Sequence, residues 1–188
     1  MNPRMLVPPP VEPVSLEEAK QHLRVELTDE DPLISNLIQT AREHAESFQN
    51  RSFITRTYEL FLDIWPDASF VLPMGPIQKI ISVVCLDENG EEIQVNPDIY
   101  FLNSKGHISL NKGEIWPDVV LRKTEGVKIT YEAGYGSDSS RVPANVKQAI
   151  LLMVAHWYLY RENVSEKPLY IVPLGAYLLL GIDRVWPL

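Results

Sequence analysis

The stretch PANVKQAILLMVAHWYLYREN, residues 143–163, is the longest helical pattern in the chain, and the other segments are interpreted around it. Pro143 suits the first position of a helix, where its missing N–H removes no hydrogen bond. Apolar residues recur at three- and four-residue spacing and also fill most of the remaining circumference. A helix of this kind is buried on several sides. We therefore expect this central helix to build the core and to contact a neighbouring subunit through Ile150, Val154, Trp157 and Tyr158.

Composition and charge exclude several classes of protein. The 188 residues are enough for one domain with a substantial core, and a net charge of −8 with a pI near 5.0 disfavours a surface built to neutralise phosphates. The single cysteine, Cys85, excludes an intrachain disulfide and a cysteine-based zinc site. The apolar run at residues 149–160 is too short to span a bilayer, and residues 1–13 lack the features of a signal peptide. We expect cytoplasmic synthesis and no membrane contact.

Two helices are expected before the β region. Four prolines between residues 8 and 13 predict an extended arm over residues 1–14, with a disordered tail as the alternative. Ser15 and Glu18 have the spacing of a capping box, which begins a first short helix. A second, amphipathic helix is expected from about Pro32 to Asn50. Its apolar stripe comprises Ile34, Leu37, Ile38, Ala41, Ala45 and Phe48.

The pattern changes to the two-residue period of β-strands over residues 54–132. Asn89-Gly90 favours the positive backbone angles of a tight turn, so residues 93–95 should pair with the strand at 77–86. Further short strands are expected at 99–102, 107–110 and 127–131. These segments predict a small antiparallel β unit.

The chain ends in a strongly apolar segment, residues 169–188, in which 174–182 predict a short helix. The complete order predicts an α+β fold with a mainly helical core, made of the N-terminal helices and the central helix, and an inserted small antiparallel β unit. We expect one domain over residues 15–188, with 15–50 helical, 54–132 β and 143–188 helical.

The sequence contains no recognisable catalytic, cofactor-binding or metal-binding motif. The histidines His22, His44, His107 and His156 fall on separate predicted elements, without the spacing of a metal site. The acidic run Asp29 to Asp31 lies at a helix start, where the helix dipole accounts for it. We therefore expect no enzyme activity, no cofactor and no metal.

Several motifs resemble the head-tail connector (adaptor or head completion) family of long-tailed bacteriophages and prophages. They are LEEAKQHLR at residues 16–24, LPMGPIQKI at 72–80, LDENG at 86–90, AGYG at 133–136 and PLGAYLLLGIDR at 173–184. The resemblance covers nearly the whole chain after Val14. It implies a structural virion protein that forms a twelve-fold ring under the portal protein, extends the DNA channel and joins head to tail.

The resemblance also implies the partners. These are the portal protein, the next connector, stopper or tail-completion protein, and double-stranded DNA that passes through the lumen. The negative net charge indicates that DNA passes without tight binding. The location implied is the head-tail junction of the virion.

Three other functions stay open from the sequence. The nearest is a tail-completion or stopper protein in the adjacent ring of the same junction. A small hydrolase would use the acidic run at Asp29 to Asp31 with His22 or His44, and an interaction module unrelated to virions would need no chemistry at all.

The apolar C-terminal segment is the expected docking site for the portal. The residues expected to contact it are Leu178, Leu179, Val185, Trp186 and Leu188. The alternative is that Leu174, Leu178 and Leu179 cap the central helix within the same subunit. Both can hold if the helix packs internally and residues 185–188 reach outward.

Overall fold

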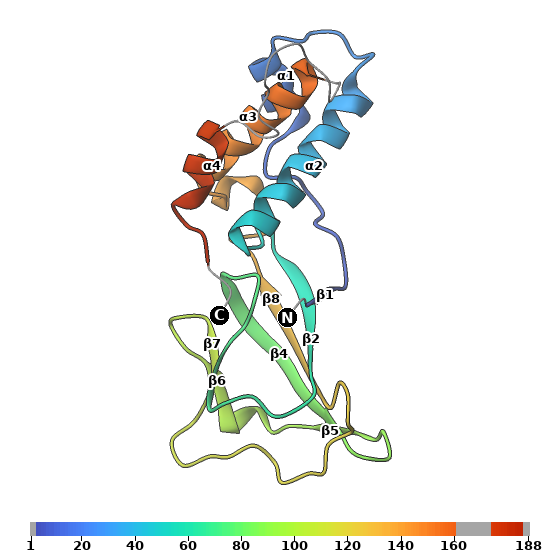
Figure 1. Ribbon diagram of the computed structural model, residues 1–188, viewed down its shortest axis with the longest axis vertical. Coiled ribbons are helices and arrows are strands. Elements are labelled where there is room, and N and C mark those ends of the chain that lie inside the picture. The colour runs from blue at the N-terminus through green and yellow to red at the C-terminus, as the bar shows by residue number, and fades with distance from the viewer. Residues whose placement is uncertain (1–2, 161–173, 186–188) are drawn as a thin grey trace. The chain divides into compact units, whose positions relative to one another are not determined.

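The computed structural model describes residues 3–160 and 174–185 and divides into two compact units. Residues 1–9 and 55–134 form one unit, called here the β unit, and residues 10–54 and 135–188 form the other, called the helical unit (Figure 1). Each unit has its own cluster of buried apolar side chains. The chain therefore has two separate cores.

The helical unit contains four α-helices among its described residues. These are α1 (Leu16–Leu23), α2 (Asp31–Gln49), α3 (Ala144–Leu159) and α4 (Leu174–Gly181), with a 3₁₀ turn, η2 (Ser139–Arg141), before α3. The capping box is confirmed: the Ser15 hydroxyl accepts from the Glu18 N–H at 3.1 Å, and the Glu18 carboxylate accepts from the Ser15 N–H at 2.8 Å. Helices α1 and α2 both end at a left-handed residue, Arg24 and Asn50.

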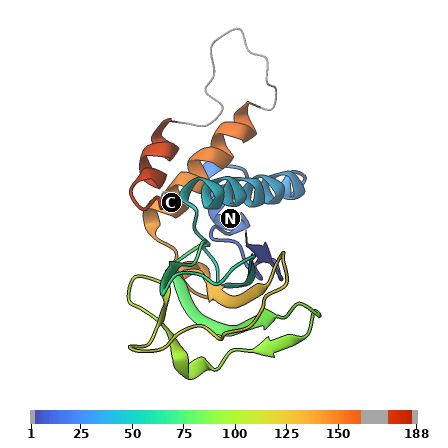
Figure 2. The ribbon, with the colours of Figure 1, turned by 60° about the horizontal axis from the view of Figure 1, so that its bottom comes forward.

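Helix α3 is the centre of the helical unit. It packs against α1, α2 and α4, and Figure 2 shows α2 and α4 beside it. The predicted stripe of α2 faces the same core, with Ile34, Ile38, Ala41 and Ala45 fully or almost fully buried. The buried residues of α3 are Val146, Ala149, Ile150, Met153 and Val154.

A charged residue lies inside the helical unit. Arg42 on α2 is 3% exposed and donates to Glu12 at 2.7 Å and to Glu46 at 3.0 Å. Glu46 also accepts from the Phe53 N–H at 2.9 Å. Burial alone would lower the pKa of Arg42, but the two carboxylates outweigh it and raise the pKa. This pairing fixes the residues before α1 to the side of α2.

The β unit contains two antiparallel sheets. The five-stranded sheet has the order β1-β2-β8-β4-β5, and the three-stranded sheet has the order β3-β7-β6. The strands are β1 (Arg4–Met5), β2 (Arg56–Leu62), β3 (Ser69–Val71), β4 (Ile77–Leu86), β5 (Glu92–Gln94), β6 (Tyr100–Leu102), β7 (His107–Leu110) and β8 (Val127–Ala133). A 3₁₀ turn, η1 (Pro97–Ile99), precedes β6.

Alternation along the strands builds the core of the β unit. In β2 and β8 every second residue is buried, beginning with the first of each strand. Tyr58 and Tyr131, directly opposite each other, stack with ring centroids 5.8 Å apart. The predicted return of the chain after Asn89-Gly90 is confirmed, because Ile93 pairs with Cys85 and Gly90 has a φ of +84°.

The expectation of a mainly helical fold with a small β insertion is wrong. The described part of the chain is mixed, with four helices and two antiparallel sheets. Strand pairing joins residues far apart in sequence, so short separate runs do not reveal that they build one five-stranded sheet with its own core. The sheet also includes a strand, β1, from the segment that its prolines indicated to be an extended arm.

Candidate functional site

Three of the histidines, His44, His107 and His156, make packing contacts or hydrogen bonds with neighbouring side chains. Among the described residues, no group of three or more His, Cys, Asp or Glu side chains could hold a metal ion. His44 packs edge-on against Trp157 and Tyr177, each 6.2 Å away between ring centroids. The His156 ring lies 5.2 Å from that of Tyr160, and His107 is 3.4 Å from the Ser69 hydroxyl.

The acidic run at the start of α2 contributes to packing of the helical unit. Asp31 forms an ion pair with Lys20 on α1 at 2.6 Å. Glu30 accepts a hydrogen bond from the hydroxyl of Tyr158 on α3. These contacts join α1 and α3 to the N-terminus of α2, so both carboxylates have a structural role.

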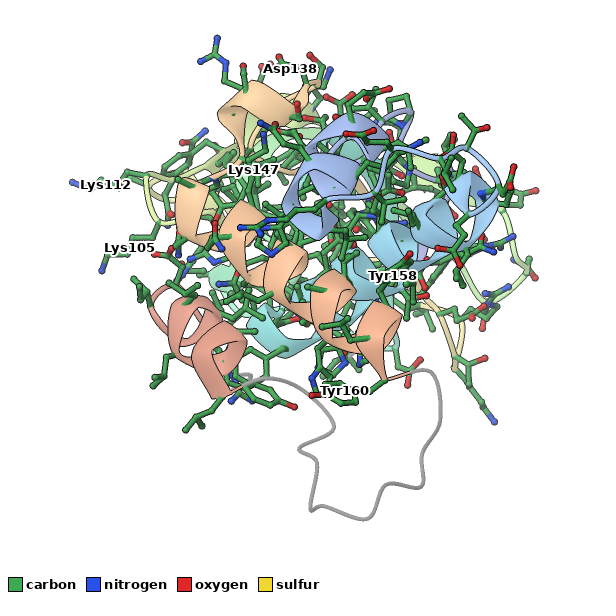
Figure 3. The ribbon with its side chains drawn as sticks, turned by 90° about the horizontal axis from the view of Figure 1, so that it is seen from above. Lys105, Lys112, Asp138, Lys147, Tyr158 and Tyr160 are labelled. Atoms are coloured by element: carbon green, nitrogen blue, oxygen red, sulfur yellow. The ribbon has the colours of Figure 1, made fainter. Side chains whose placement is uncertain are left out.

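The predicted subunit contact falls on α3, whose two halves differ in exposure. Ile150 and Val154 are completely buried by the chain's own helices. Trp157 and Tyr158 are partly buried against the same core. Beyond them Leu159 is 70% exposed and Tyr160 is 49% exposed. Figure 3 shows Lys147 near the start of α3 and Tyr158 and Tyr160 near its end.

An exposed apolar stripe runs along α4 and the residue after it. Leu174, Leu178 and Ile182 are spaced by four residues and are 66%, 69% and 69% exposed. That spacing places them on one face. The opposite face is buried in the helical unit through Ala176 and Leu180. We call residues 174, 178 and 182 the α4 stripe.

Polar contacts with the backbone hold α4 and the following residues on the helical unit. The side chain of Gln49, which is completely buried, donates to the Leu180 carbonyl at 2.7 Å. Asn145 donates to the Leu179 carbonyl at 3.1 Å, and Arg51 donates to the Asp183 carbonyl at 2.6 Å. The Val185 N–H donates to the Gln49 carbonyl at 3.0 Å. These bonds orient the α4 stripe away from the core.

The predicted docking residues therefore differ in their surroundings. Leu178 is exposed, whereas Leu179 and Val185 are partly buried. Trp186 and Leu188 lie outside the described residues. Within residues 3–160 and 174–185, no helix is long and apolar enough to cross a membrane.

Comparison with known proteins identifies the family. The sequence profile of the head completion protein family matches residues 12–167. The chain belongs to the head completion protein family. The resemblance seen in the sequence motifs is thereby confirmed. A search of curated protein sequences found no relative.

Solved structures share the fold of this head completion protein. A chain in the virion of a native gene transfer agent (GTA) particle is 22% identical, with a TM-score of 0.83. Chains in the neck of an empty GTA particle, computed with C6 symmetry, and of a native GTA particle, computed with C12 symmetry, are 22% and 21% identical, both with a TM-score of 0.81. In each case the alignment covers 100% of this chain and 97% of the other.

Two features of this head completion protein were not predicted from the sequence. One is the common exposed face of Leu174, Leu178 and Ile182, which their four-residue spacing within the predicted helix 174–182 could have indicated. The other is the buried Arg42, which the sequence signals by placing a charged residue next to Ala41 and one turn before Ala45 and Glu46. A charge on an apolar face predicts a buried partner.

Proposed function

We propose that this protein is a structural component of the head-tail junction of a phage or phage-like particle, where twelve copies form a ring under the portal protein and extend the DNA channel. The observation that carries the proposal is the family match over residues 12–167. The neck structures computed with C6 and C12 symmetry support a ring. Protein enclosing a channel in such a ring has a structural role that needs no catalytic residues.

The ring contact is proposed at the end of α3. Burial of Ile150 and Val154 means that they would reach another subunit only if the helical unit opened. Trp157 and Tyr158 are partly exposed, and Leu159 and Tyr160 extend the apolar surface beyond them. A head-to-tail contact repeated by rotation closes into a ring.

Docking to the portal protein is proposed through α4 and the residues that follow it. The α4 stripe supplies an exposed apolar surface, and burial of apolar area stabilises a contact by about 25 cal/mol per Å². A contact of modest strength suffices when it is repeated around a ring. The predicted docking residues Leu178, Leu179, Val185, Trp186 and Leu188 all follow the start of α4.

DNA is proposed to pass through the ring without tight binding. The net charge of the protein is −8, so an excess of acidic side chains opposes tight binding of the negatively charged DNA phosphates. Retention of double-stranded DNA at low salt measures this. Tight, salt-sensitive binding would contradict the proposed passage.

The experiment that tests the function is electron microscopy of the purified protein with and without its portal protein. Twelve-fold rings seated directly on the portal are expected. Rings that join only after another connector has bound would identify the protein as the stopper or tail-completion ring. A strict monomer at high concentration that also fails to bind the portal would refute the proposal.

A truncation after Asp183 tests the docking segment. If residues 184–188 dock, the truncated protein stays folded but no longer joins portal-bearing heads. If the segment only covers its own subunit, thermal stability falls because the bond from Val185 to Gln49 is lost, and attachment persists. The full-length protein is the control.

A further inference from the structure

The strand β1 is held to the β unit by a very short ladder. It contains only Arg4 and Met5, which pair antiparallel with Glu59 and Tyr58 of β2 at the edge of the five-stranded sheet (Figure 1). One further backbone bond joins the Leu6 N–H to the Thr57 carbonyl at 3.1 Å. Both residues of β1 are exposed. The strand therefore contributes little burial to the unit that it completes.

The residues that form and follow β1 expose an unusual run of apolar side chains. Met5 is 44% exposed, Leu6 is 43% exposed and Val7 is 61% exposed. Successive residues of an extended segment point to opposite sides, so this run presents apolar surface on both. An exposed apolar segment at a sheet edge favours pairing with another chain.

The connection behind β1 is stiff and its far end is fixed. Residues 8–10 are three prolines, which fix φ and favour an extended chain of about 3.1 Å per residue. After them Glu12 accepts from Arg42 at 2.7 Å, and Val14 is 1% exposed in the core of the helical unit. The boundary between the two units falls within the prolines, at residues 9 and 10. The arm is thus anchored at one end and carries a weakly held strand at the other.

We propose that β1 is exchanged between copies of this chain, so that in the assembled ring the strand of one subunit pairs with β2 of its neighbour. The inference rests on the proposed ring. Every copy has the same strand and the same edge, so the exchanged ladder keeps the pairs Arg4 with Glu59 and Met5 with Tyr58. Exchange of an identical element breaks no net hydrogen bond.

A closed ring makes this exchange complete. In a head-to-tail arrangement each subunit gives one strand and receives one, so no β2 edge stays unpaired. The neighbour then covers part of the apolar run at residues 5–7.

Disulfide trapping of the pair at positions 4 and 59 tests the exchange. Residues directly opposite in an antiparallel ladder are within the distance that a disulfide spans. In the variant Arg4→Cys/Glu59→Cys, oxidised after assembly, exchange gives covalent oligomers on a non-reducing gel. The same ladder within one subunit gives only a covalent monomer. The native Cys85 is completely buried, and the parent protein controls for it.

The matched control is Glu59→Cys/Thr130→Cys. Glu59 pairs with Thr130 on β8 in the same sheet, so this disulfide stays within one subunit under every outcome. A second measurement mixes the single variants Arg4→Cys and Glu59→Cys before assembly. Covalent dimers form in this mixture only if strands pair between chains, which is expected. Circular dichroism of each variant verifies that it has folded.

Ring formation is scored separately by electron microscopy, so the two proposals can fail independently. Covalent oligomers in rings support both. A covalent monomer in rings overturns the exchange and leaves the ring intact. Covalent oligomers without rings support exchange and overturn the ring, whereas a covalent monomer without rings overturns both.

Discussion

Helices α3 and α4 are both apolar around most of their circumference, yet they differ in how much of their surface is buried. Helix α3 packs against α1, α2 and α4, and five of its residues, Val146, Ala149, Ile150, Met153 and Val154, are completely buried. Helix α4 is half as long and buries only Ala176 and Leu180, while Leu174 and Leu178 stay exposed. Composition therefore does not decide burial. What decides it is the number of neighbouring elements, and among residues 3–160 and 174–185 no element covers the face of α4 that carries Leu174 and Leu178.

The largest effect is expected from truncating the buried face of α3. Met153→Ala removes a completely buried side chain and should lower the free energy of unfolding by about 2–5 kcal/mol. Urea unfolding followed by circular dichroism at 222 nm measures the change in the helical unit. Leu159→Ala, on the same helix but 70% exposed, is the matched control and should have little effect. An equal decrease in the free energy of unfolding for both variants would show that the two faces of α3 do not differ in burial.

The next effect concerns the bond that holds α4. Gln49→Ala removes the donor to the Leu180 carbonyl and should cost roughly 1–3 kcal/mol, because a buried acceptor is left without its partner. Urea unfolding again measures it. Gln39→Ala is the control, since Gln39 lies on the exposed side of α2. A neutral Gln49→Ala would mean that apolar contacts alone orient α4.

Sequence periodicity predicted the elements better than their assembly. The ends of α2, β4 and β7 fall within two residues of expectation, because periodicity and helix signals are local. The relative amounts of helix and sheet could not be predicted in this way, because the five-stranded sheet depends on pairs of residues that are distant in the chain, such as Glu59 with Thr130. Sequence indicated that α3 was apolar all round but could not show that its own unit covers Ile150 and Val154.

A smaller effect, dependent on pH, tests how α3 is held at its beginning. Two groups lower the pKa of Glu18 below its ordinary value. The larger effect comes from the hydrogen bond that the Ser15 N–H donates, and the smaller one from the ammonium group of Lys147 on α3, whose Nζ lies 2.9 Å from the Glu18 carboxylate. A carboxylate with a lowered pKa stabilises the folded state above its unfolded pKa, and this contribution is lost as pH falls through the folded pKa. Glu18→Gln should cost roughly 0.2–1 kcal/mol at pH 7, since the pair is partly exposed and screened.

The measurement is the free energy of unfolding between pH 7 and the acid range for the wild type and Glu18→Gln. The difference should be present at pH 7 and shrink below the ordinary carboxylate pKa of about 4.3. Glu17→Gln, one position earlier on α1, is the control for a general charge effect. A difference that grows on acidification would have the wrong sign and contradict the assignment.

The smallest effect on stability is expected at the exposed face of α4. Leu178→Ser should change the free energy of unfolding by no more than about 0.5 kcal/mol, because the side chain is already 69% exposed. The same variant should nevertheless weaken attachment to portal-bearing heads, because the α4 stripe is the proposed docking surface. Ile64→Ser in the β unit removes an equally exposed apolar side chain, at 75%, and should leave attachment unchanged. Cosedimentation with portal-bearing heads measures the binding. Loss of stability without loss of attachment would show that the α4 stripe serves only the core of its own subunit.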